Sequence, residues 1–117
     1  MKLEVLADAD GLFHVGCAGD VSLAELEPRE PLSVLLGPGC YRYHLLLNFD
    51  QVTFLDTAGV SWLIRVKQAC DRAGGRMVLH SVPPIAAHLL QLLRMHEVFA
   101  IGEDERQGRV LASGGAP

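Results

Sequence analysis

The chain has 117 residues, half of them hydrophobic, which is enough for one domain with a core and too few for two ordinary domains. With a net charge of −4 and a pI near 5.6, it has no basic cluster dense enough to follow a phosphate backbone, so we expect no nucleic-acid partner. Its three widely spaced cysteines are typical of reduced thiols, and it shows neither a signal peptide nor a membrane-length apolar run. We expect a soluble, cytoplasmic protein without direct membrane insertion.

The chain is predicted to open with a β-hairpin. Residues 3–7 alternate apolar and polar side chains, residues 8–11 (Asp-Ala-Asp-Gly) are a strong turn signal, and residues 12–18 have the pattern of the returning strand. Two short helical pieces are expected next, over residues 21–26 and 31–36, and the second is ended by the Gly-Pro-Gly run that follows it.

A continuous apolar run over residues 43–49 predicts a strand that is buried on both faces, as in a parallel sheet covered by helices. The clearest helix of the chain follows over residues 56–73 and is expected to stop at the Gly-Gly pair after it. At about 100° per residue, this helix has two faces. The apolar face comprises Trp62, Leu63, Val66, Ala69, Cys70 and Ala73. The polar face comprises Ser61, Arg65, Gln68 and Arg72, with Thr57 on the same side.

Two further strands and one helix complete the predicted order. A strand is expected over residues 76–81, then a helix that begins at the Pro-Pro pair, then a last short strand over residues 98–101. The helix is expected to bury a face formed by Ile85, Leu89, Leu90, Leu92 and Leu93. The alternation predicts a single α/β domain over residues 1–105, with a mixed, mostly parallel sheet and amphipathic helices. Residues 106–117, charged and then rich in Gly and Ala, are predicted to be a flexible tail.

The sequence lacks motifs that would indicate catalysis or a bound cofactor. The five histidines share no metal-ligand spacing, and the three cysteines form no C-x-x-C pair. There is no G-x-S-x-G elbow, no G-x-x-x-x-G-K-[ST] phosphate loop and no G-x-G-x-x-G run. We therefore predict no catalytic residues, no metal and no cofactor, and a protein that is not an enzyme.

The turn Asp56-Thr57-Ala58-Gly59 joins an apolar strand directly to the clearest helix, and it has two readings. In the structural reading, Asp56 caps the helix and Gly59 allows the helix and the strand to pack closely. In the functional reading, the Thr57 hydroxyl lies at a helix start, where the helix dipole favours a negatively charged group such as a phosphate. The residues alone leave both readings open.

The segment around this turn resembles the STAS domain, the family of anti-sigma-factor antagonists. The family's signature is an apolar strand, then D-[ST]-[SA]-G-[LIV], then an amphipathic helix, and residues 54–60 match it as FLDTAGV. The Gly-Gly stop, the short strand at residues 77–79 and the Leu-rich helix before residues 98–101 also agree with the family. The resemblance implies a regulatory protein-binding module with the STAS fold.

In that family, a serine kinase that is itself the anti-sigma factor phosphorylates the hydroxyl residue directly before the motif's glycine, and a metal-dependent phosphatase reverses the reaction. Here Ala58 occupies that position, so Thr57 is the only hydroxyl left in the motif and becomes the phosphorylation candidate. The D-T-A-G-[LV] spelling also resembles a second branch. In that branch, a STAS subunit binds the ATPase of a phospholipid-trafficking ABC transporter, and the motif threonine lies at the contact.

The resemblance implies a partner surface at the start of the helix and along its exposed side. The implied partner is an anti-sigma factor or a serine kinase with an ATP-binding fold, together with a phosphatase, and the alternative partner is the transporter ATPase. A homodimer is left open. Trp62 is an aromatic anchor of this surface if it is exposed, and a core residue if it is buried. The expected surface comprises Asp56, Thr57, Ala58, Gly59, Ser61, Trp62 and Arg65.

Overall fold

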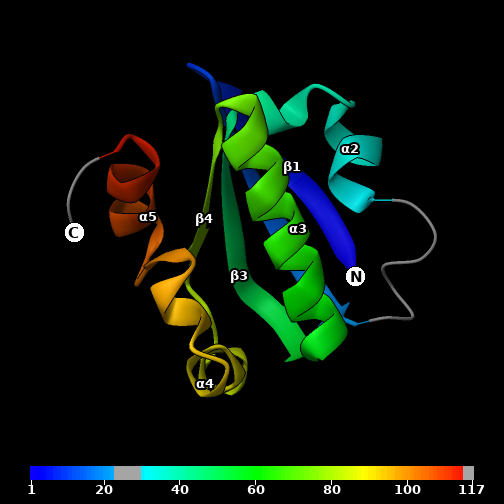
Figure 1. Ribbon diagram of the computed structural model, residues 1–117, viewed down its shortest axis with the longest axis vertical. Helices are drawn as coiled ribbons and strands as arrows, with labels where there is room; N and C mark the ends of the chain where they lie inside the picture. Colours follow the sequence, from blue (N-terminus) through cyan, green and yellow to red (C-terminus); the bar gives the residue numbers. More distant parts are fainter. Residues whose placement is uncertain (23–29, 115–117) are drawn as a thin grey trace.

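The computed structural model describes residues 1–22 and 30–114, and its elements alternate between strands and helices (Figure 1). Most of the helical piece predicted over residues 21–26 lies outside the described residues. The elements are β1 Lys2–Ala9, β2 Leu12–Val21, α2 Pro31–Leu36, the 3-10 turn η1 Cys40–Arg42, β3 His44–Leu55, α3 Thr57–Ala73, β4 Arg76–His80, α4 Pro84–Leu92, the 3-10 turn η2 Met95–Glu97, β5 Ala100–Gly102 and α5 Glu105–Ala112.

The five strands form one mixed sheet in the order β1-β2-β3-β4-β5. β1 and β2 pair antiparallel and every other neighbouring pair is parallel, which confirms the predicted hairpin and the mostly parallel sheet. The hairpin turns at Asp10 and Gly11, whose φ angles of 56° and 76° suit a two-residue turn in which both central residues are left-handed. The predicted single α/β domain is therefore correct in its class and its topology.

β3 is longer than the strand predicted over residues 43–49, because it continues to Leu55. Its pairing with β2 contains two irregularities in register. The second lies near the end of the strand, where Asp20 pairs with Phe54 and the residue before it, Thr53, is skipped. An extra residue on one strand is a β-bulge, which turns the side chains that follow toward a new direction.

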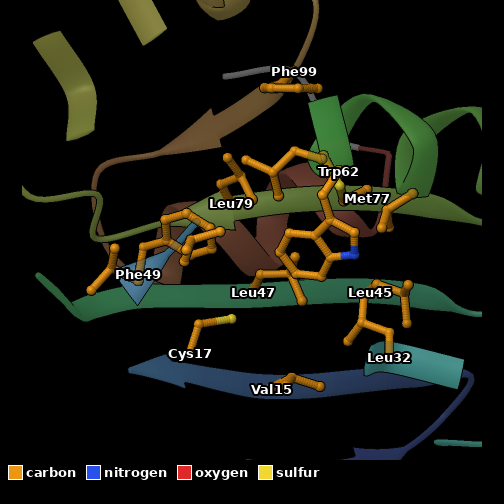
Figure 2. Close-up of a cluster of buried hydrophobic side chains, with 14 of the residues drawn as sticks. Val15, Cys17, Leu32, Leu45, Leu47, Phe49, Trp62, Met77, Leu79 and Phe99 are labelled. Atoms are coloured by element: carbon orange, nitrogen blue, oxygen red, sulfur yellow. The ribbon is translucent and has the colours of Figure 1, made fainter. Parts of the chain in front are cut away.

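The main core lies between α3 and one face of the sheet (Figure 2). The two faces of α3 follow the prediction up to its last turn, since Leu63, Val66 and Cys70 are buried, whereas Arg65 and Gln68 are exposed. Ala73, which was predicted to lie on the apolar face, is exposed at the end of the helix. Burial raises the pKa of the Cys70 thiol to about 12, so the thiol stays protonated and packs as an apolar group. The sheet contributes Val15, Cys17, Leu45, Leu47, Phe49, Met77 and Leu79.

α5 covers part of the second face of the sheet, so residues 106–112, which were predicted to belong to a flexible tail, are helical instead. The side chain of Asp104 caps the helix, and Ala112 packs in a small cluster with Leu46. A Cβ on Gly108 would lie 2.8 Å from the Leu46 side chain, so α5 approaches β3 closely. The buried residues of α5, Gly108 and Ala112, are small. The helix therefore lacks the large apolar side chains at helical spacing by which an amphipathic helix is predicted from sequence.

α4 buries only part of its predicted face: Leu90 is buried and Leu89 packs partly buried against the core, as expected. Ala86 and Leu90 are its buried residues, whereas Ile85 and Leu92 are 64% and 66% exposed. The prediction assigned the largest apolar side chains to the core. Ala86 and Leu90 are four residues apart, so they lie one above the other on the same side of the helix. The small side chain of Ala86 lets this side approach the sheet closely.

Two histidines next to α5 form a buried, hydrogen-bonded pair. His14 on β2 and His80 on β4 are 4% and 2% exposed, and their Nε2 atoms are 2.9 Å apart. His14 Nδ1 lies 3.5 Å from the Arg109 guanidinium, and His80 Nδ1 lies 2.8 Å from the Ser81 hydroxyl. Because an arginine can only donate, His14 carries its proton on Nε2 and donates to His80, whose own proton then points to Ser81. Both imidazoles are satisfied in their neutral form.

Candidate functional site

Asp56 is the single residue between the end of β3 and the start of α3. Its carboxylate accepts a 2.8 Å hydrogen bond from the Gly59 N–H, and its carbonyl oxygen accepts one from the Val60 N–H at 3.0 Å. These are the contacts of a helix N-cap, so the structural reading of the turn holds for Asp56. Its predicted contact with a partner remains a prediction.

Gly59 is buried, and the fold requires the absence of a side chain there. A Cβ at this position would overlap the carbonyl oxygen of Val21 and would lie 2.8 Å from Cδ1 of Leu55. The first turn of α3 therefore touches the ends of β2 and β3 because residue 59 is glycine. Within the predicted partner surface, Gly59 supports the turn from inside.

Thr57, Ser61 and Arg65 are exposed, and Ala58 is partly exposed. At about 100° per residue, the three exposed side chains lie within an arc of about 80° on the helix surface. With a rise of about 1.5 Å per residue, they extend over about 12 Å from the helix start. The structure therefore brings these four predicted residues together on one accessible surface.

Trp62 does not belong to this surface: of its two predicted alternatives, an exposed anchor or a buried core residue, the structure shows the core residue. Its side chain is 1% exposed, and its indole N–H donates a 2.6 Å hydrogen bond to Glu30 Oε1 (Figure 2 shows the ring within the core). The Glu30 carboxylate also caps α2 through the Ser33 N–H at 2.8 Å and accepts a hydrogen bond from the Tyr41 hydroxyl. A buried indole with a satisfied N–H is a core residue that fixes α2 against α3.

Phe54 is a surface residue that the sequence did not reveal. It is 45% exposed, two residues before Asp56, and the bulge at Thr53 precedes it. The Thr53 hydroxyl donates a 3.0 Å hydrogen bond to Asp20, which fixes the bulged strand against β2. If buried and exposed side chains alternated strictly along β3, Phe54 would follow Val52 into the core. The bulge at Thr53 shifts the alternation by one residue, so Phe54 is exposed instead. Its neighbour Leu55 packs in the core beneath α3, so the Phe54 side chain, next along the strand, points to the opposite face of the sheet.

Metal-ligand clusters and reactive thiols are two kinds of group that bear on the chemistry of the described residues. Within residues 1–22 and 30–114, no three histidine, cysteine, aspartate or glutamate side chains are placed to hold a metal ion. The three cysteines are buried, and burial raises the pKa of Cys17 to about 12 and, with the nearby Glu30 carboxylate, that of Cys40 to about 11. These thiols are therefore protonated and poor nucleophiles. The same described residues include no helix with the length and apolar character needed to cross a bilayer.

The N-cap predicts a clear stability difference between two variants of Asp56. Asp56→Ala removes the acceptor for the Gly59 N–H and is expected to lower the free energy of unfolding by about 0.5–2 kcal/mol. Asp56→Asn keeps an acceptor oxygen and is expected to lose much less, since asparagine caps helices about as well. Chemical denaturation followed by circular dichroism measures both, and equal losses in the two variants would contradict the capping role.

A family model described as the STAS domain matches residues 7–108. Among solved structures, the unphosphorylated form of the anti-sigma factor antagonist SpoIIAA has a TM-score of 0.67 at 14% identity, with 98% of this chain and 100% of that chain covered. A putative anti-sigma factor antagonist from Thermotoga maritima gives 0.74 at 13% identity, covering 96% and 93%. An anti-sigma factor antagonist from Mycobacterium paratuberculosis gives 0.74 at 16% identity, covering 96% and 95%.

These structural matches are below 25% identity and establish the fold, whereas the family model covers most of the chain and establishes the family. The capped turn at Asp56 and the exposed start of α3 lie inside the matched region. The chain belongs to the STAS domain family.

Proposed function

We propose that this protein is an anti-sigma-factor antagonist that binds its partner through the start of α3. The docking face comprises Thr57, Ala58, Ser61 and Arg65. The observation that carries the proposal is the arrangement of the motif turn. Asp56 and Gly59 hold the helix start in place, and Thr57 is exposed on it. A rigid, exposed helix start suits recognition by another protein.

The expected partner is an anti-sigma factor or a related serine kinase with an ATP-binding fold. The three structural neighbours are described as anti-sigma factor antagonists or putative ones, and this supports the partner class. The proposed module is cytoplasmic, and it acts by binding its partner rather than as an enzyme. Phosphorylation of Thr57, with a phosphatase to reverse it, belongs to the same proposal.

A second candidate function is supported by Ala58. A phosphorylated member of the family would carry a hydroxyl at this position, and here it has a methyl group that is partly exposed. In this second candidate function, the protein is a subunit of a phospholipid-trafficking ABC transporter. Its docking face would bind the transporter's ATPase without phosphorylation. The identity of the bound protein separates the two candidates, and mass spectrometry of the protein from its native cell tests Thr57 for phosphate.

The experiment that tests the docking face is the partner affinity of Thr57→Glu. The added charge at the centre of the face must be desolvated on binding, and we expect affinity to fall at least tenfold, equivalent to about 1.4 kcal/mol. Stability should not fall, because a carboxylate at a helix start interacts favourably with the dipole.

The matched control is Thr57→Val, which keeps the branched shape without adding charge. The partner is first captured from the native cell on the wild-type protein, identified by mass spectrometry and then produced pure. Wild-type affinity in Thr57→Glu, with Thr57→Val as the reference, would remove the start of α3 from the interface.

A further inference from the structure

The exposed side of α3 continues beyond the docking face and becomes cationic. Thr57, Ser61, Arg65, Gln68 and Arg72 are all exposed. At about 100° per residue they lie within an arc of about 80°, so they form one strip along the helix. The strip begins at the motif threonine and ends in the last turn of α3.

A third arginine lies across a cleft from the end of this strip. Arg42 on η1 and Arg72 on α3 both line a cleft of about 450 Å³, whose other walls include Tyr41 and Ala69. The Arg42 guanidinium lies over the Tyr43 ring, 5.8 Å from its centroid, which holds it on this side of the molecule. Two guanidinium groups thus face one opening at the end of α3.

None of these arginines has a carboxylate partner within the described part of the chain. The ion pairs there are Lys67–Asp71, Arg94–Glu97 and Arg109–Glu105, so Asp71, which precedes Arg72 in the chain, is already paired with Lys67 at 2.7 Å. Arg65, Arg72 and Arg42 are therefore uncompensated cations in a protein whose net charge is −4. We call these three residues the arginine face.

We propose that the arginine face is the second half of the partner interface and receives an acidic surface of the partner protein. This inference rests on the proposed docking at the start of α3. The strip from Thr57 to Arg72 is short enough to lie within a single interface. These two residues are about 22 Å apart along the helix axis, and a standard interface of about 800 Å² per partner is roughly 30 Å across.

The chemistry selects carboxylates as the complementary groups. A guanidinium presents several N–H donors in a fixed plane and binds a carboxylate through two of them, which orients the partner as well as attracting it. An acidic partner would be steered to this face at low ionic strength, while like charges elsewhere on the chain would repel it. Three arginines give too few contacts to hold a nucleic acid backbone, and the partner is accordingly a protein.

The partner is first identified and purified. Its binding to three variants, Thr57→Glu, Arg72→Glu and Arg106→Glu, is then measured. Arg72→Glu is expected to weaken binding at least tenfold and to reduce the salt dependence of the dissociation constant between 50 and 500 mM NaCl. Arg106→Glu is the matched control, because Arg106 is also exposed and has no ion pair in the described chain, but it lies on α5 over the other face of the sheet. Its affinity is expected to stay within twofold of wild type.

The outcomes separate the inference from the proposal beneath it. If Thr57→Glu releases the partner and Arg72→Glu binds like Arg106→Glu, docking at the start of α3 stands and the arginine face is wrong. If Thr57→Glu and Arg72→Glu both bind like wild type, the interface lies elsewhere and both fail. The inference that the arginine face binds an acidic protein surface would also be contradicted by either of two results. One is a wild-type affinity that does not change with salt, and the other is binding that nuclease treatment abolishes. Circular dichroism of each variant confirms that the fold is intact.

Discussion

Replacing Gly59 by alanine is expected to lower the free energy of unfolding by about 3 kcal/mol or more, although the change adds only one methyl group. That methyl would overlap the backbone carbonyl oxygen of Val21 and crowd Leu55. A backbone atom cannot rotate away as a side chain can, so the start of α3 must move off the sheet. Since small domains are stable by about 5–15 kcal/mol, the loss is a large fraction of the total.

The matched control for this prediction is Gly16→Ala on β2. A Cβ there would lie 3.4 Å from the Leu6 side chain, an ordinary contact, and Gly16 does not have a positive φ. We expect this variant to stay within about 0.5 kcal/mol of the wild type or to gain stability. Denaturation midpoints that fall equally in both variants would show that the junction of α3 with β2 and β3 is not tightly packed.

Acidification is expected to destabilise the protein through the buried His14–His80 pair. Burial lowers the pKa of both imidazoles, and the neighbouring Arg109 lowers each further, while the Glu105 carboxylate opposes the shift. His14 also lowers the pKa of His80, and Asp50 raises it. Geometry gives the same direction, because an added proton would place two N–H groups against each other or one against Arg109.

The direction of the pH dependence follows from proton binding. A histidine with a lowered pKa stays neutral in the fold, whereas the unfolded chain takes up a proton below its ordinary pKa of about 6.5. The stabilisation is therefore complete above about pH 6.5 and declines as the pH falls below it. Each histidine that stays neutral contributes a loss of at most about 1.4 kcal/mol per pH unit.

Imidazole resonances in an NMR titration of the wild-type protein test this directly. Two of the five histidines should remain neutral below pH 6.5, and the double variant His14→Gln/His80→Gln should lose less stability than wild type between pH 7.5 and 5. Titration of both buried histidines near pH 6.5, as in an open chain, would contradict the hydrogen-bonded pair.

Features with local causes could be predicted from the sequence. The N-cap at Asp56, the two faces of α3 and the stop at Gly74 depend on residues within one or two turns of each other. The hairpin and the parallel order of strands follow from turn chemistry and from the apolar runs. These signals were sufficient for the fold class and for the resemblance to the STAS family.

Features set by distant contacts could not be predicted. Trp62 lies at the edge of the apolar arc, and the carboxylate that satisfies its indole N–H belongs to Glu30, which is 32 residues away in the chain. Phe54 is exposed only because β3 contains a bulge, and α5 packs through Gly108, whose lack of a side chain gives no periodic signal. Three-dimensional proximity, rather than local pattern, determines these residues.

Chemical-shift mapping of the isotope-labelled protein with its purified partner tests the proposed interface most directly. We predict that the largest amide shifts lie at the exposed positions of α3 from Thr57 to Arg72 and at Arg42. Residues of β1 and α5 should remain near their free positions. Shifts concentrated on β1 or α5, with the start of α3 unchanged, would contradict docking through the motif turn.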